Sequence, residues 1–167
     1  KITMTKYVLS IDGGGVRGLA SATFLSELDK VAPKKLSECF DLIVGTSTGG
    51  IIALAISILD LQKDDLVKIY SKENIKKIFS PFRYRILGSK YAGKVKRKVF
   101  KDYFKAETLS VAKTPTMITA FDLEKRRVKM FKSWTEGYLP ARRVAAATSA
   151  APTYFPAESI EGQWYID

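Results

Sequence analysis

Residues 40–50 have the sequence FDLIVGTSTGG, in which an apolar run typical of a buried strand ends abruptly at Gly45. A second apolar run follows at residues 51–59 and predicts a buried helix. The pattern G-x-S-x-G at a strand–turn–helix junction is that of a nucleophile elbow. Gly45 and Gly49 fit this interpretation, because side chains two positions before and after the serine would collide in so tight a turn. We therefore predict that Ser47 stands at a helix N-terminus, where free N–H groups and the helix dipole favour a developing negative charge.

The absence of histidine limits the base that this serine can use. The chain has no histidine and a single cysteine, Cys39, so a Ser-His-Asp triad, a Cys-His pair and a histidine zinc site are excluded within it. The base must then be a carboxylate, a lysine or a tyrosine. Asp167 is a candidate because it follows a short apolar strand predicted at residues 163–166, and apolar neighbours would raise the pKa of its carboxyl group. On this ground alone, an ordinary acid at a strand end remains the alternative.

Composition predicts one globular domain over residues 1–167. The chain is 46% hydrophobic and has no apolar run of the roughly 18 residues needed to span a membrane. No signal peptide is visible at the N-terminus. We expect a cytoplasmic protein that can associate peripherally with membranes.

The excess of basic over acidic residues predicts an acidic partner. The net charge is +11, and nine basic residues fall between Arg83 and Lys105 against one acid, Asp102. The simpler interpretation of this segment is a solvated helix face. The sharper one is a surface that docks on anionic membranes through residues 83–105. We expect no nucleic acid partner, because no recognition motif is present. The sequence gives no prediction of oligomeric state.

Alternation of buried strands with helices predicts an α/β fold, a three-layer α/β/α sandwich with a mostly parallel central sheet and an antiparallel portion. Strands are predicted at 7–11, 42–44, 115–121, 127–131 and 163–166, the third and fourth as an antiparallel pair. Helices are predicted at 19–31, 51–59, 63–79 (broken near 73–74), 95–105 and 141–147, with a loop at 80–93. The expected buried faces are Ala20, Phe24, Leu28 and Val31 on the first helix, and Val95, Val99, Phe100, Tyr103 and Phe104 on the fourth.

The loop DGGGVRG at residues 12–18 has two interpretations. It fits G-x-G-x-x-G between a strand and a helix, which is the context of a dinucleotide site. Against this, Asp12 would repel a pyrophosphate, and Asp41 precedes a strand where the ribose-binding acid should follow one. The other interpretation is an oxyanion hole formed by the N–H groups of Gly14 and Gly15. Its occurrence together with the serine elbow favours the second.

The sequence resembles the patatin-like phospholipase family in four separate pieces that occur in the family's order and span nearly the whole chain. They are residues 12–18 (DGGGVRG), 45–50 (GTSTGG), 148–156 (TSAAPTYFP) and the final Asp167. In the family this aspartate is followed by Gly and then Gly or Ala, with more chain beyond. We therefore expect a continuation after residue 167.

The resemblance implies a lipid acyl hydrolase domain over residues 1–167 that cleaves esters of phospholipids or other acyl lipids without a metal or other cofactor. It implies a catalytic dyad of Ser47 as nucleophile and Asp167 as base. The implied oxyanion hole consists of Gly13, Gly14 and Gly15, with Arg17 close by. Arg17 is a candidate for substrate binding through a phosphate or head group, and a solvated residue of the first helical turn is the alternative. From its small residues, the stretch 149–152 (SAAP) is expected to be a helix end that packs under the site rather than a catalytic segment. The alternatives are a non-catalytic storage or lipid-binding member of the same fold, and a nucleotide-binding domain that uses the glycine loop.

Overall fold

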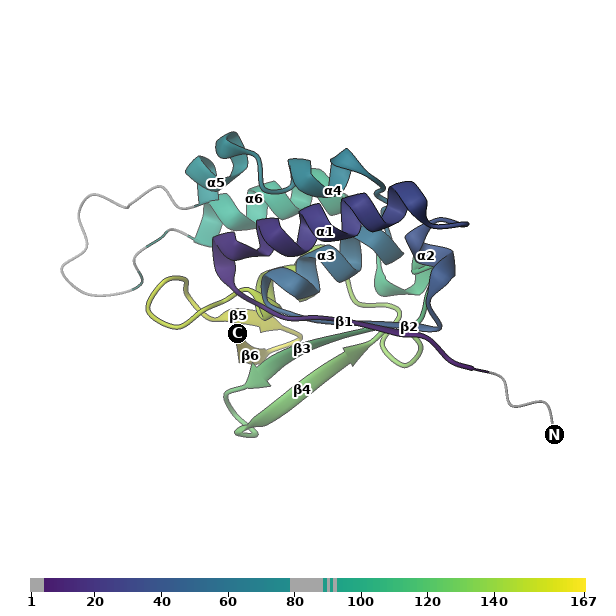
Figure 1. Cartoon of the computed structure of the whole chain (residues 1–167). Helices are drawn as coiled ribbons and strands as arrows, with labels where there is room; N and C mark the ends of the chain where they lie inside the picture. The colour runs from purple at the N-terminus through teal and green to yellow at the C-terminus, as the bar shows by residue number, and fades with distance from the viewer. Residues whose placement is uncertain (1–4, 79–88, 90, 92) are drawn as a thin grey trace.

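The computed structural model describes residues 5–78, 89, 91 and 93–167, and its frame is a six-stranded sheet (Figure 1). The strand order is β1-β2-β3-β6-β5, and β4 also pairs with β3. The strands are β1 (Val8–Ile11), β2 (Leu42–Thr46), β3 (Thr116–Asp122), β4 (Arg127–Lys132), β5 (Glu158–Ile160) and β6 (Gln163–Ile166). Strands β1, β2 and β3 are parallel, whereas β3 with β4, β3 with β6 and β5 with β6 are antiparallel. The predicted α/β class, with parallel and antiparallel portions, is confirmed.

Strand β3 organises this sheet, because two strands share one of its edges. Strand β4 pairs with it from Met117 to Asp122 and so occupies the first edge. On the second edge, β2 pairs with residues 116–119, and β6 pairs with residues 121–122 in the opposite direction. The C-terminal ends of β2 and β6 therefore approach each other head-on beside Ala120.

The helices described here cover one face of the sheet (Figure 1). Every second residue of β3 is buried, as expected for a strand with one covered face. The opposite face is exposed at Val8 and Met130, and the second helical layer of the predicted sandwich is not among the described residues. The helices are α1 (Gly18–Val31), α2 (Leu36–Cys39), α3 (Thr48–Ser57), α4 (Asp64–Lys68), α5 (Lys72–Ile78), α6 (Gly93–Phe104) and α7 (Ala141–Thr148), with 3-10 turns η1 (Gly15–Arg17) and η2 (Leu109–Val111).

Helix α3 forms the centre of the core. All of its residues from Gly49 to Ser57 are buried, which confirms the helix predicted from the apolar run. It packs on β2 and β3 and also contacts α1 and α7. Among the helices of the described residues, none combines the length and apolar character that a membrane span needs.

The face predicted to be buried on α1 is wrong. Phe24 and Val31 are 68% and 79% exposed, whereas Asp29 is only 7% exposed. The two carboxylate oxygens of Asp29 accept backbone N–H groups of Leu36 (3.3 Å) and Lys63 (3.0 Å). Because these bonds satisfy a buried carboxylate, the helix turns this side inward and leaves apolar side chains in solvent.

The prediction for the buried face of α6 is confirmed at Phe100 and Phe104 and wrong at Val95, and it missed Lys96. The large side chains that it buries belong to Lys96, Phe100 and Phe104, whereas Val95 is 38% exposed. These three positions are spaced by four residues and therefore share one helix face.

Other predicted elements are confirmed with shifted ends. The helix predicted at 63–79 is two helices, α4 and α5, separated at residues 69–71 rather than near 73–74. The sequence did not predict β5 or α2, which are only three and four residues long. The loop predicted at 80–93 lies outside the described residues except at positions 89, 91 and 93.

The glycines of the elbow are required by close backbone packing. A Cβ on Gly45 would lie 2.6 Å from the carbonyl carbon of Gly49. A Cβ on Gly49 would overlap the carbonyl oxygen of Ile11 and lie 2.7 Å from that of Asp12. The elbow is thus pressed against the end of β1, which brings the loop that follows β1 close to the serine.

We expect Gly49→Ala to destabilise the protein by about 2 kcal/mol or more, because the clash is with backbone that cannot rotate away. Alanine favours a helix over glycine by about 1 kcal/mol, which only partly offsets the clash. Urea unfolding measures the change. Gly14→Ala is the matched control, since its Cβ would meet nothing closer than 3.6 Å. Equal loss of stability in both variants would contradict this account of the elbow.

Candidate active site

Ser47 occupies the turn between β2 and α3 in a strained backbone conformation. Its φ of 55° and ψ of −127° lie outside the regions that most side chains adopt. This conformation ends the strand and starts the helix within a single residue. Such strain persists only where the surroundings impose it, and it is found frequently at functional sites.

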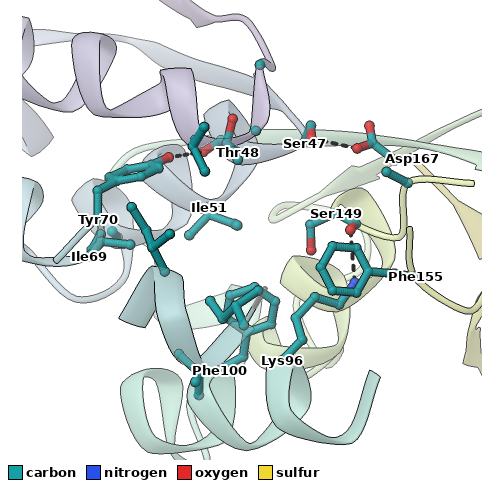
Figure 2. Close-up of a pocket in the computed structure, with 18 of the residues that line it drawn as sticks. Ser47, Thr48, Ile51, Ile69, Tyr70, Lys96, Phe100, Ser149, Phe155 and Asp167 are labelled. Atoms are coloured by element: carbon teal, nitrogen blue, oxygen red, sulfur yellow. Dashed lines mark hydrogen bonds between the residues drawn. The ribbon is translucent and has the colours of Figure 1, made fainter. Parts of the chain in front are cut away.

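Asp167 faces Ser47 across the gap on the edge of β3. Ser47 Oγ donates a hydrogen bond of 2.5 Å to Asp167 Oδ2 (Figure 2). The backbone N–H of Asp167 donates to the carbonyl oxygen of Ala150 at 3.1 Å. The structure therefore brings together two residues that are 120 positions apart in the sequence.

Thr148, at the end of α7, fixes the elbow from the other side. Its hydroxyl accepts a hydrogen bond from the Ser47 N–H at 2.8 Å and donates one to the carbonyl oxygen of Thr119 at 2.6 Å. The segment 148–150 thus bonds to the backbones of both Ser47 and Asp167. The sequence predicted only that this segment packs beneath the site. The hydrogen bond between the Thr148 hydroxyl and the Ser47 N–H was not predicted, because the local sequence does not show that this hydroxyl lies beside residue 47.

The environment of Asp167 makes it a stronger base than an aspartate in water. Burial raises the pKa of its carboxyl group above the usual 3.8, while the hydrogen bond from Ser47 and the positive charge of Lys96 act in the opposite direction. A raised pKa brings a carboxylate closer to the basicity that proton abstraction requires.

The glycine loop lies against the serine. A Cβ on Gly13 would be 2.8 Å from the Cβ of Ser47 and 3.6 Å from its hydroxyl oxygen. Gly14, Gly15 and Arg17 line the cavity in front of the serine. All the predicted site residues are thus gathered around one place, in which the backbone of the loop can approach a group bound to Ser47.

The cavity in front of Ser47 and Asp167 has a volume of about 380 Å³. Figure 2 shows Ser47 and Asp167 on one side of it, with α6 on the opposite side and Tyr70 at one end. Its walls away from these two residues are mainly apolar and come from α3, α5, α6 and the residues that follow α3 and α4, including Ile51, Leu59, Ile69, Ile75, Val99, Phe100 and Phe104. This is a suitable shape for an extended apolar group.

Two polar side chains of the cavity were not predicted. Burial raises the pKa of Tyr70, whose hydroxyl donates to the carbonyl oxygen of Thr48 at 3.3 Å, so it remains a neutral donor. Lys96 extends from α6 toward Ser149. Its spacing from Phe100 and Phe104 is the signal that could have placed it on the buried face. Within residues that the structure describes, no group of Cys, Asp and Glu is arranged to hold a metal ion.

Comparison with known proteins gives a consistent result. The family model of patatin-like phospholipase matches residues 9–167. The chain is 34% identical to Patatin-17 of Solanum cardiophyllum, over 89% of this chain and 43% of that protein. It is 31% identical to a cGAMP-activated phospholipase of Pseudomonas aeruginosa, over 91% of this chain and 49% of that protein. The chain therefore spans less than half the length of these relatives.

A solved structure supports the fold independently of sequence. The crystal structure of VipD from Legionella pneumophila superimposes with a TM-score of 0.66 at 12% sequence identity, covering 99% of this chain and 46% of that one. At this identity the likeness concerns the fold alone. Together with the family model, which spans all but the first eight residues, it leads to one conclusion: the chain belongs to the patatin-like phospholipase family.

Proposed function

We propose that this domain is a serine acyl hydrolase that cleaves ester bonds of phospholipids or related acyl lipids through a Ser47–Asp167 dyad. Membership of the patatin-like phospholipase family supports a lipid hydrolase. The observation that carries the finer proposal is the 2.5 Å hydrogen bond from Ser47 Oγ to Asp167 Oδ2 at the edge of an apolar cavity. A nucleophile, a base and an apolar binding site are then adjacent.

In the first half of the proposed reaction, Asp167 Oδ2 accepts the hydroxyl proton as Ser47 Oγ bonds to the ester carbonyl carbon. The carbonyl oxygen gains the negative charge, which N–H groups of the loop Gly13 to Gly15 would stabilise together with the N-terminus of α3. Collapse of this intermediate breaks the bond to the alcohol oxygen. The alcohol leaves with the proton that Asp167 held, and the acyl group stays on Ser47.

In the second half, a water molecule gives its proton to Asp167 and attacks the acyl carbon. The bond to Ser47 Oγ then breaks, the proton returns to Oγ, and the fatty acid is released. The apolar cavity would hold the acyl chain throughout, because burying hydrocarbon there removes it from water. Arg17, at the cavity, would contact the phosphate or head group.

We expect a fluorophosphonate probe to label Ser47 covalently, and Ser47→Ala to lower phospholipid hydrolysis by about 10³-fold or more, because the attacking atom is removed. Mass spectrometry of the labelled peptide and release of fatty acid from a defined phospholipid panel measure the two effects. Ser10→Ala is the control, since Ser10 is an exposed serine on β1. A folded protein that neither reacts at Ser47 nor hydrolyses any lipid would instead favour the non-catalytic alternative. Tight binding of NAD(P) without hydrolysis would favour the nucleotide-binding alternative.

The dyad also predicts the pH dependence of the rate. Asp167 works as a base only when it is deprotonated, so activity is present above its folded pKa and is lost as the pH falls through it. Because burial raises that pKa above 3.8, we expect the midpoint of the acid limb of kcat to lie above pH 3.8. Below the pKa of Asp167, kcat should fall about ten-fold per pH unit. Measurement with an uncharged ester avoids titration of the substrate. Asp102→Asn, an exposed change on α6, should leave the limb in place, and an acid limb at or below pH 3.8 would rule out this role for Asp167.

We also propose that the outer side of α6 docks on anionic membranes. A groove between α5 and α6 is lined by three lysines (Lys77, Lys94 and Lys98), one acid (Asp102) and the partly exposed Val95, so its charged lining has a net positive charge. Lysines around an apolar side chain suit a surface of phosphate head groups. Part of the predicted docking segment 83–105 lies outside the described residues, so the proposal rests on residues 93–105 and on Lys77 of α5.

Lys94→Glu with Lys98→Glu should weaken binding to phosphatidylserine-containing vesicles at least about 10-fold, because each lysine near such a surface contributes about 1 kcal/mol. Co-sedimentation at low and physiological salt measures the binding. Lys125→Glu with Arg126→Glu makes the same change of charge at the exposed turn after β3, and we expect a smaller effect there. Equal binding of the unmodified protein to neutral and anionic vesicles would overturn the proposal.

A further inference from the structure

Lys96 is the one lysine of α6 that the fold buries. Its side chain is 2% exposed, whereas Lys94, Lys98 and Lys101 of the same helix are exposed. Nζ donates hydrogen bonds to the carbonyl oxygens of Ala146 (3.0 Å) and Ser149 (2.9 Å). It also lies 4.5 Å from the centre of the Phe155 ring. The amino group is therefore held by specific partners at the end of α7 (Figure 2).

The partners of Lys96 belong to the turn that holds the dyad. In the sequence, Thr148 lies between Ala146 and Ser149, and its hydroxyl bonds to the Ser47 backbone. Ala150 directly follows Ser149, and its carbonyl oxygen bonds to the Asp167 backbone. The last carbonyl groups of a helix have no partners within it and carry the negative end of its dipole. A lysine Nζ donates hydrogen bonds to these carbonyl oxygens and, when charged, places a positive charge at the negative end of the dipole.

Packing alone does not account for a lysine at this position. Burial of an amino group is unfavourable even when it is hydrogen-bonded. An apolar side chain of similar length would avoid that penalty, but it would remove the donor from the carbonyl oxygens of Ala146 and Ser149. Lys96 also lines the cavity that contains Ser47 and Asp167. A costly polar group beside a reactive one suggests a functional role.

We propose that Lys96 is a positioning residue for acyl transfer, which fixes the end of α7 that holds the backbones of Ser47 and Asp167 and sets the charge next to the Asp167 carboxylate. This inference rests on the proposed function. In this proposal, Lys96 forms no bond to the substrate. Its effect passes through the turn at residues 146–150 and through its electrostatic interaction with Asp167.

The charge of Lys96 changes near neutral pH. Burial lowers its pKa to about 7; the charges of Glu158 on β5 and of Asp167 raise it, and that of Arg97 on α6 lowers it. Arg97 and Arg143 of α7 both pair with the buried Glu158, at 3.1 Å and 3.6 Å. A neutral amine still has two N–H groups for its two carbonyl partners, so the tether persists when the charge is lost.

The charged form of Lys96 lowers the pKa of Asp167. As the pH rises through about 7, Lys96 loses its proton and Asp167 becomes a stronger base. We therefore expect kcat for an uncharged, water-soluble ester to show an acid limb from Asp167 and a second, smaller rise near pH 7. The second rise is the signature of Lys96.

Lys96→Met removes both donors and the charge while keeping an unbranched stem. We expect kcat to fall about ten-fold or more with KM changed by less than about two-fold, because the dyad is misplaced while the cavity remains. The acid limb should move to higher pH and the rise near pH 7 should disappear. In hydrogen exchange, the backbone amide of Asp167 should lose protection, since its acceptor is Ala150. Lys101→Met, an exposed change of the same kind on the same helix, should show none of these effects.

Lys96→Arg separates the tether from the titration, because arginine keeps donors and a charge at every pH used. It should preserve the acid limb of the unmodified enzyme and remove the rise near pH 7. If Lys96→Met does not fold, this variant decides, and a persisting rise near pH 7 overturns the proposal. A folded Lys96→Met enzyme with unchanged kcat and pH profile overturns it as well.

Failure of the proposed function gives a different result. If the unmodified protein neither hydrolyses an ester nor reacts at Ser47, the acyl hydrolase proposal fails, and Lys96 has no reaction to position. The exchange of the Asp167 amide in Lys96→Met still tests the tether, because it requires no activity. Unchanged protection of that amide would remove the structural basis of the inference.

Discussion

The hydrogen bond between Ser47 and Asp167 depends on two strands that share one edge of β3. Strand β2 occupies that edge along residues 116–119, and β6 occupies it from the opposite direction at residues 121–122. The residues that follow the two strands must then meet in the gap between them. The two side chains need no third residue to connect them, because the sheet itself sets their separation.

Holding Ser47 in this gap requires support from several distant parts of the chain. A residue with its φ of 55° carries backbone strain of about 1–3 kcal/mol. The buried helix α3 on one side and the Thr148 hydroxyl on the other oppose relaxation of that strain. The surrounding glycines allow backbone segments to approach where any side chain would separate them. Contacts that stabilise the fold at this turn therefore also set the position of the Ser47 hydroxyl.

Helix α6 connects the interior of the site with the molecular surface. Phe100 and Phe104 face the core and the cavity, Lys96 reaches the end of α7, and Lys94 and Lys98 line the outer groove. A shift of this helix would change the width of the cavity and the position of the turn at residues 146–150 together. Docking of its outer side on a surface would thus act on the same element that forms a wall of the apolar cavity.

The sequence by itself determined the local features of this protein. The elbow, the glycine loop, the strand before Asp167 and most helices have patterns that extend over fewer than twenty residues, and the lack of histidine limited the choice of base. Only the tertiary structure decided which face of α1 is buried, that Lys96 points inward, that β5 completes the sheet and that Thr148 bonds to Ser47. The Thr148 contact depends on a partner far away in the sequence, and the buried faces of α1 and α6 depend on competition between two possible sides, whereas β5 has only three residues and so no periodic pattern of its own. Periodicity shows that a helix is amphipathic, but the satisfaction of buried groups such as Asp29 and Lys96 decides which side turns inward.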